Sequence, residues 1–108
     1  MENRSFAFIK TDKKLVKIFF KDINIIKGLG NYVEVHTIDE KKYIYYRTLK
    51  DMIEKLPEEF MRVHHSYIVN LSNIKFFEDN QLLCGNLKIA VAKSYKDCLL
   101  EAISKMML

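Results

Sequence analysis

Residues 60–70 read Phe60-Met61-Arg62-Val63-His64-His65-Ser66-Tyr67-Ile68-Val69-Asn70, and the fold is decided here. The first half of this stretch interleaves apolar side chains with basic ones more tightly than a purely structural strand does. The second half contains an almost unbroken apolar run that predicts a buried strand. The stretch therefore predicts one part that anchors in a core and one part that presents hydrogen-bond donors.

On either side of this stretch the chain alternates between short β-rich segments and turn residues. Tyr32 to Ile38 alternates most clearly, with Val33, Val35 and Thr37 on one face, as a half-buried strand requires. Gly28-Leu29-Gly30-Asn31 predicts a loop before it, and Gly85-Asn86 predicts a two-residue turn near the other end. The segments expected to be extended and antiparallel are 5–10, 14–20, 23–26, 32–38, 42–46, 67–69, 74–77, 81–84 and 88–92.

Two segments change to helical periodicity. Residues 48–56 predict a short amphipathic helix with Thr48 as N-cap and Asp51 at N3, and Pro57 ends it. A second helix is expected behind Ser94 as N-cap, with Asp97 at N3. Its apolar stripe is expected to consist of Tyr95, Cys98, Leu99, Ala102, Ile103 and Met106, so Cys98 is predicted to pack in the core.

Composition favours one soluble domain covering residues 1–108. Hydrophobic residues make up 49% of the chain, enough to build one core, and no linker-like segment divides it. The formal net charge is +4, which suits an anionic partner without requiring one. No apolar run is long enough to cross a membrane and no signal peptide is evident, so we expect a cytoplasmic protein.

The candidates for catalysis or metal binding form no recognisable set. His64 and His65 are adjacent, so on an extended strand they point to opposite faces and cannot chelate one ion. No nucleotide-binding glycine motif is present, and Cys84 and Cys98 are too few for a disulfide framework. We expect no enzyme activity, no cofactor and no metal.

Hydrogen-bond donors gather instead at the boundaries of β elements, in three clusters. They are Asn31 with Tyr32, the group Arg62, His64, His65 and Ser66, and the group Lys93, Ser94 and Lys96. These clusters either line one edge of an elongated sheet or are unrelated surface residues. The lysines of the first third of the chain are likewise either phosphate-facing or simply solvated.

Three motifs together resemble the LytTR DNA-binding domain: Gly28-Leu29-Gly30-Asn31-Tyr32-Val33, Thr48-Leu49-Lys50 and the 60–70 stretch. The resemblance runs from about Phe8 to about Leu100. It implies a mainly β fold of elongated antiparallel sheets with a short central helix and a C-terminal helix. It also implies sequence-specific binding of duplex DNA in bacterial transcription regulation, with strand-end loops in successive major grooves and a bent duplex.

The resemblance assigns roles to individual residues. Base contacts are expected from Asn31, Tyr32, His65 and Lys93. Phosphate contacts are expected from Lys41, Arg62, Ser66, Ser94 and Lys96. Many family members have arginine where this chain has His65, and histidine cannot make arginine's bidentate contact to guanine. Because histidine gains charge as the pH falls from about 7.5 toward 6, binding through His65 should tighten over that range.

The resemblance also sets expectations about binding partners, and other functions are still possible. Promoter direct repeats, a homodimer on DNA and a phosphorylatable receiver domain are expected from the resemblance. No receiver-like pattern precedes Phe8, so the chain is either a stand-alone binder or a C-terminal piece. His64 is expected either to hydrogen-bond within the fold or to contact DNA. Two other functions remain open: sequestering a partner regulator, or binding single-stranded RNA through Tyr32, Tyr43 and Tyr45.

Overall fold

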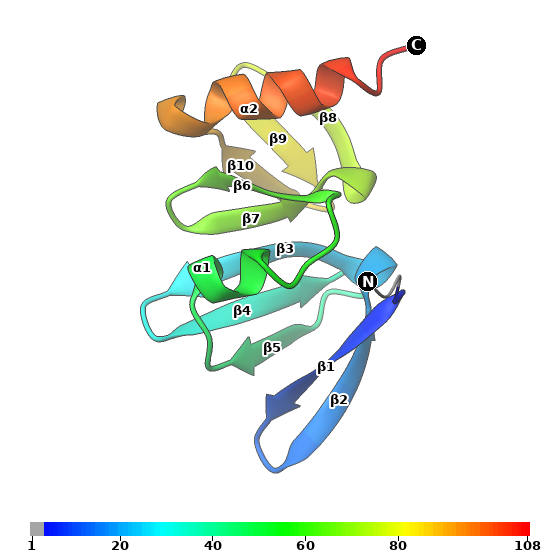
Figure 1. Ribbon diagram of the computed structural model, residues 1–108, viewed down its shortest axis with the longest axis vertical. Helices are drawn as coiled ribbons and strands as arrows, with labels where there is room; N and C mark the ends of the chain where they lie inside the picture. The colour runs from blue at the N-terminus through cyan, green and yellow to red at the C-terminus, as the bar shows by residue number, and fades with distance from the viewer. Residues whose placement is uncertain (1–3) are drawn as a thin grey trace.

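The computed structural model describes residues 4–108, in which it contains ten short strands and two α-helices (Figure 1). The strands are β1 (Phe6–Thr11), β2 (Lys14–Phe19), β3 (Ile23–Leu29), β4 (Tyr32–Thr37), β5 (Lys42–Tyr45), β6 (Phe60–His64), β7 (Tyr67–Asn70), β8 (Ile74–Glu78), β9 (Gln81–Cys84) and β10 (Leu87–Ala90). The helices are α1 (Leu49–Ile53) and α2 (Lys93–Ser104), and the single 3-10 turns are η1 (Phe20–Asp22) and η2 (Leu71–Asn73).

All strand pairs are antiparallel and form three sheets. The central sheet has the order β5-β4-β3-β7-β6, and it is flanked by the hairpin β1-β2 and by the sheet β10-β9-β8. The sheets follow one another along the longest axis of the molecule, which measures 42 Å against 29 and 25 Å for the other two. Figure 1 shows the hairpin projecting at one end and α2 covering the β8–β10 sheet at the other. This is the mainly β, elongated arrangement that the sequence predicts.

The central sheet separates two hydrophobic cores because its strands alternate. In β3, Ile26 faces a core shared with the hairpin and α1, while its neighbour Ile25 faces a second core shared with β9, β10 and α2. Ile68 and Val69 divide between the two cores in the same way in β7. All four side chains are 0–1% exposed, and burial of each contributes about 1.5–3 kcal/mol.

Asn70, the last residue of the 60–70 stretch, is a buried polar side chain. Its amide nitrogen donates to the carbonyls of Phe20 at 3.2 Å and Ile23 at 2.9 Å. Its side-chain oxygen accepts from the Ser72 amide at 3.0 Å. Asn70 therefore connects β7 to η1 and the start of β3, the segment that joins the hairpin to the central sheet.

Most predicted elements lie within one or two residues of the observed ones. The face of β4 formed by Val33, Val35 and Thr37 is buried, and the oxygen of the Thr48 side chain accepts from the Asp51 amide at 3.2 Å. The helix after Thr48 is shorter than predicted, since α1 ends at Ile53. β3 is longer, because Gly28 and Leu29 belong to the strand and only Gly30-Asn31 forms the turn.

The prediction for the C-terminal helix is wrong in its starting residue and in part of its stripe. Ala92 is the N-cap and makes no side-chain cap bond, so Ser94 lies inside the first turn rather than in front of it. The buried stripe centres on Leu99, and the thiol of Cys98 is exposed on its flank. Met106 is 61% exposed because the helix ends at Ser104. A helical spacing does not fix which of several apolar residues at the margin of a stripe meets the core.

Candidate nucleic-acid interface

The β3–β4 turn presents Asn31 to solvent. Leu29 pairs with Tyr32 across the turn, which leaves Gly30 and Asn31 as its two connecting residues. Gly30 has φ +78°, a conformation that glycine adopts without strain. Asn31 is exposed, whereas Tyr32 is half-buried with its ring 5.7 Å from that of Tyr46.

The β6–β7 turn presents His65 to solvent and is braced by three hydrogen bonds. The Arg62 guanidinium donates to the His65 carbonyl at 2.8 Å, and the Ser66 amide donates to Nδ1 of His64 at 3.0 Å. The Gly28 amide donates to the Ser66 carbonyl at 2.8 Å, which couples this turn to β3. His65 is exposed, and its own ring takes part in none of these bonds.

The bracing explains the parts played by His64 and Arg62. An amide can only donate, so Nδ1 of His64 carries no proton in this turn, and the ring also packs edge-on against Tyr67 at 5.6 Å. The prediction that His64 hydrogen-bonds within the fold is confirmed. The Nε atom of Arg62 is buried without a hydrogen-bond partner among residues 4–108, so most of this side chain faces the protein.

The first turn of α2 supplies the third cluster. Lys93, Ser94 and Lys96 are all exposed, and Val91 and Ala92 separate them from the end of β10. The Ala92 amide, just before them, donates to the Val63 carbonyl at 2.9 Å. This backbone bond fixes the start of α2 against β6, the strand that leads into the His65 turn.

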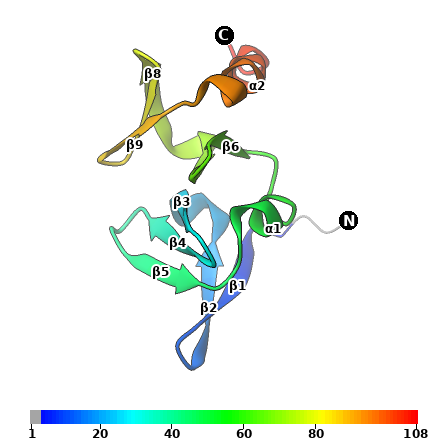
Figure 2. The same ribbon diagram turned by 90° about the vertical axis from the view of Figure 1, so that its left-hand side faces the viewer.

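The three clusters lie along one edge of the molecule. Lys27 pairs with Tyr67 while Ile25 pairs with Val69, so the β6–β7 turn and the β3–β4 turn are at the same end of the central sheet. Figure 1 shows both turns on the left, with the start of α2 above them, and Figure 2 looks onto this edge. Of the two possibilities that the sequence left open, the arrangement on one edge is the one observed.

Lys41 is the predicted site residue that does not join this edge. It lies in the β4–β5 turn, and β4 runs away from Tyr32, so this turn is at the opposite end of the sheet. The Ile38 amide donates to the Asp22 carbonyl at 2.8 Å there, and the ammonium of Lys41 lies 3.7 Å from a carboxylate oxygen of Asp39. The hydroxyl of Thr37 donates to Asp39 and lowers the pKa of that carboxyl.

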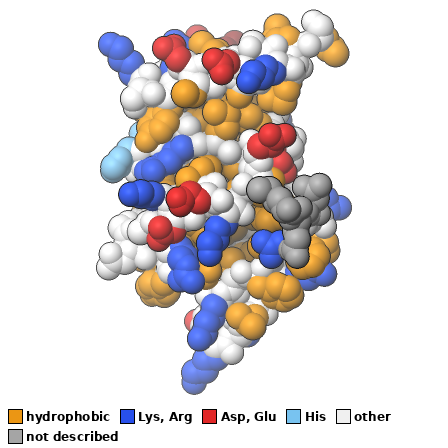
Figure 3. Space-filling model, viewed as in Figure 1, with side chains coloured by type: hydrophobic (Ala, Val, Ile, Leu, Met, Phe, Trp, Pro, Cys, Tyr) orange, Lys and Arg blue, Asp and Glu red, His pale blue; other side chains and the backbone are white. Residues whose placement is uncertain are grey.

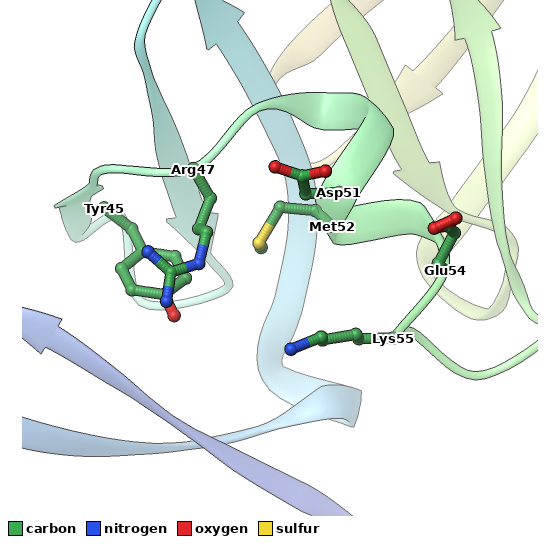
Figure 4. Close-up of a pocket in the computed structure, with 6 residues that line it drawn as sticks. All are labelled: Tyr45, Arg47, Asp51, Met52, Glu54 and Lys55. Atoms are coloured by element: carbon green, nitrogen blue, oxygen red, sulfur yellow. The ribbon is translucent and has the colours of Figure 1, made fainter.

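Sequence reasoning missed Tyr46 and Arg47, which also reach the edge. Val33 pairs with Tyr45, so the residues after β5 lie beside the start of β4. The guanidinium of Arg47 lies over the ring of Tyr45, 5.1 Å from its centroid (Figure 4). It also donates to the Tyr46 carbonyl at 3.0 Å. The signal available in the sequence was the position of Arg47 at the end of a predicted strand.

Metal binding would need a cluster of ligands, and thiol chemistry would need a reactive cysteine. Among residues 4–108, no three His, Cys, Asp or Glu side chains gather in a way that could hold a metal ion. Burial raises the pKa of the Cys84 thiol to about 11, which disfavours the nucleophilic thiolate. Tyr43 and Tyr45 are partly buried and pack against the core. Within residues 4–108, no helix is long and apolar enough to span a bilayer.

Comparison with known proteins shows which family the sequence matches and which solved structure resembles the fold. A sequence model of the LytTr DNA-binding domain matches residues 13–104. The structure superposes on the LytTr DNA-binding domain of a methyl-accepting/DNA response regulator from Bacillus cereus with a TM-score of 0.79. The two chains are 22% identical, and the match covers 94% of this chain and 98% of that one, so this neighbour shows the fold.

A weaker match involves a much longer protein. The GTPase-activating protein GYP5 of Saccharomyces cerevisiae is 26% identical over 88 residues, which span 81% of this chain. The chain covers 10% of the length of that protein. A match of this extent carries no argument about function.

Proposed function

The chain belongs to the LytTr DNA-binding domain family, and we propose that it recognises a specific duplex sequence through the edge that carries Asn31, His65 and Lys93. The family is one of DNA-binding domains, and its members serve transcription regulation. The observation that supports the proposal is the alignment of three separate donor clusters on one edge of an elongated fold. In this proposal the sheets hold the turns in place, and the exposed residues of the turns contact the bases.

The β3–β4 hairpin enters a major groove. A major groove is about 12 Å wide and admits a two-stranded β-ribbon. Asn31 stands exposed at the tip of such a ribbon. The side-chain amide of asparagine can make a bidentate contact to the N6 and N7 atoms of adenine, so Asn31 is the proposed adenine reader. Tyr32, which follows Asn31 and is half-buried, contacts a base from the position beside Asn31.

His65 and Lys93 read further positions along the duplex. Neighbouring strands are about 4.8 Å apart, so two strand spacings separate the β3–β4 and β6–β7 turns by about 10 Å. Successive major grooves are about 34–36 Å apart, which is too far for these two turns to occupy. We therefore place His65 in the minor groove next to the major groove that Asn31 enters, and Lys93 beyond it on the same duplex, where its ammonium donates to guanine.

Phosphate contacts fix the register of this arrangement. Ser66, Ser94 and Lys96 lie beside the reading residues and supply them. Arg62 reaches a phosphate with the part of its guanidinium that is not engaged at the His65 carbonyl. Because the three clusters are spread along the edge, bending the duplex toward the protein brings its backbone within reach of all of them.

Selection of bound duplexes from a random library, followed by titration of the selected site, tests the proposal. Asn31→Ala and His65→Ala should each weaken binding to that site by about 1–3 kcal/mol, that is, by about 5- to 150-fold, and relax base preference at one position. Ser72→Ala, away from the edge, is the matched control. If no duplex binds at about 50 mM salt, or if the edge variants bind like the control, the proposal is wrong.

A further inference from the structure

The hairpin β1-β2 reaches the same edge as the reading turns. Thr11 pairs with Lys14, so Asp12 and Lys13 form the turn at its tip, with Asp12 at φ +53°. A cleft of about 480 Å³ separates this end of the hairpin from the end of β5. Lys10, Thr11 and Asp12 line one side of the cleft, and Tyr46 and Arg47 line the other. Since Tyr46 contacts Tyr32, the tip continues the line of the interface.

The end of the hairpin is strongly basic. Residues 6–19 contain four lysines and one aspartate. Lys10, Lys13 and Lys14 are exposed at or beside the tip. Figure 3 shows Lys and Arg side chains over the projecting end of the molecule and at intervals along the left-hand side above it. Asp12 is the one acidic side chain on the hairpin side of the cleft.

The lysines at the tip differ from Lys17, in the middle of β2. The ammonium of Lys17 lies 4.3 Å from the centroid of the Phe6 ring and 5.0 Å from that of Phe19. A lysine placed to protect an exposed strand would lie along that strand, as Lys17 does. Lys13 and Lys14 instead gather where the strands end. Across the cleft, the position of Arg47 is fixed by the Tyr45 ring and the Tyr46 carbonyl.

We propose that the hairpin tip and Arg47 together bind backbone phosphates of the duplex, forming a fourth contact beyond the three reading clusters. The inference rests on the proposed function, because it needs a duplex lying along the edge. The long axis of 42 Å exceeds one helical turn of DNA, about 34–36 Å, so the tip meets a phosphate about one turn from the start of α2. Lys13 and Lys14 act as mobile point charges, while the guanidinium of Arg47, fixed in place, contacts a phosphate at the mouth of the cleft.

This contact adds affinity without adding sequence information, because phosphate contacts position a protein and base contacts specify the sequence. The variant Lys13→Gln/Lys14→Gln removes two charges at the tip. The matched control is Lys21→Gln/Lys42→Gln, which removes the same charge from exposed positions at the opposite end of the sheet. All four positions are exposed, so circular dichroism melts should show all variants folded. Arg47→Gln tests the other side of the cleft.

The measurement is the slope of log K against log salt concentration on one selected duplex. The tip variant should give a slope shallower by about 1.8, since each lost phosphate contact lowers it by about 0.9, with an unchanged ratio of specific to non-specific affinity. Arg47→Gln should lower the slope by about 0.9, and the control should match wild type. Trimming the duplex at the hairpin end should abolish the difference between tip variant and wild type.

Equal slopes for the tip variant and the control would overturn the inference, whether both fall or neither does. A changed ratio of specific to non-specific affinity would also overturn it, because the tip would then be reading bases. If the wild-type chain binds no duplex, the proposed function fails first. If wild type binds and Asn31→Ala weakens it while the tip variant does not, the proposed function stands and this inference alone fails.

Discussion

At the scale of single residues, the His65 turn depends on Arg62 more as a brace than as a free charge. Arg62→Met keeps the apolar stem but removes both the bond to the His65 carbonyl and the buried Nε. These two changes offset each other, so the free energy of unfolding should change by no more than about 1 kcal/mol. Affinity for target DNA should nevertheless fall about tenfold, equivalent to about 1.4 kcal/mol.

The same variant separates bracing from phosphate contact. If Arg62 only braces the turn, the amides of His65 and Ser66 exchange hydrogen faster in Arg62→Met and the salt slope of DNA binding is unchanged. If Arg62 also contacts a phosphate, the slope falls by about 0.9. Unchanged amide exchange together with unchanged affinity would show that Arg62 serves neither purpose.

The two cysteines should differ sharply in reactivity. Cys98 is exposed on α2, whereas the Cys84 side chain is fully buried and its thiol lies 3.4 Å from the Asn24 carbonyl oxygen. A disulfide reagent at pH 8 should therefore modify one thiol of the native protein quickly, and the second only after denaturation. Cys98→Ser should leave no fast-reacting thiol, and a fast phase that survives in this variant contradicts the burial of Cys84.

The raised pKa of Cys84 also predicts a loss of stability in alkali. The thiol changes from a pKa of 9.0 to about 11 on folding, so between pH 9 and pH 11 the unfolded state loses its proton first. Because the unfolded state then binds fewer protons, the free energy of unfolding falls as pH rises, by up to about 1 kcal/mol per unit. Below pH 9 the thiol contributes no pH dependence. Denaturation of Cys84→Ala at several pH values should show a shallower decline than wild type.

At the scale of elements, α1 can pack against β3 only because Gly28 has no side chain. A Cβ atom at Gly28 would lie 2.8 Å from Cδ1 and 2.9 Å from Cγ of Leu49, which is itself 5% exposed. Gly28→Ala should therefore cost about 1–3 kcal/mol through overpacking. Leu49→Ala should relieve that clash, so the double variant should lose less stability than the sum of the single losses. Strict additivity would contradict this contact.

Gly30 provides the comparison within the same hairpin. No heavy atom lies within 4 Å of a Cβ built there, and its φ is +78°. Gly30→Ala should therefore cost only the strain of a left-handed alanine, about 1–2 kcal/mol, and Leu49→Ala should not relieve it.

Local signals in the sequence predict elements well but not what joins them. The alternation of β4, the Thr48 cap and the Gly85-Asn86 turn all depend on neighbours within a few residues, and all three are observed. The bonds from Asn70 to Phe20 and Ile23 span about 50 positions, and no local pattern marks them. Similarly, the order of the strands decides that Asn31, His65 and Lys93 lie along one edge of the molecule. The same strand order places Lys41 away from that edge.

At the scale of the whole molecule, the central sheet belongs to both cores. Ile25 and Ile26 are consecutive residues of β3, yet one packs against β9 and α2 while the other packs against the hairpin side. A strand cannot leave one core while remaining in the other, because the same backbone hydrogen bonds support both faces. This shared sheet is also what holds the three donor clusters in a fixed relation to one another.

The shared sheet predicts one cooperative unfolding transition. Ile25→Val and Ile26→Val each remove one methylene from a different core and should each cost about 0.5–1.5 kcal/mol. Both should lower the urea midpoint at an unchanged m value, and amide exchange under mild denaturant should lose protection equally around Leu82 in one core and Val33 in the other. If Ile25→Val lowered protection only near Leu82, the halves would unfold separately. The spacing of the three donor clusters would then not be fixed by the fold, and under the proposed function a duplex could bind one half without the other.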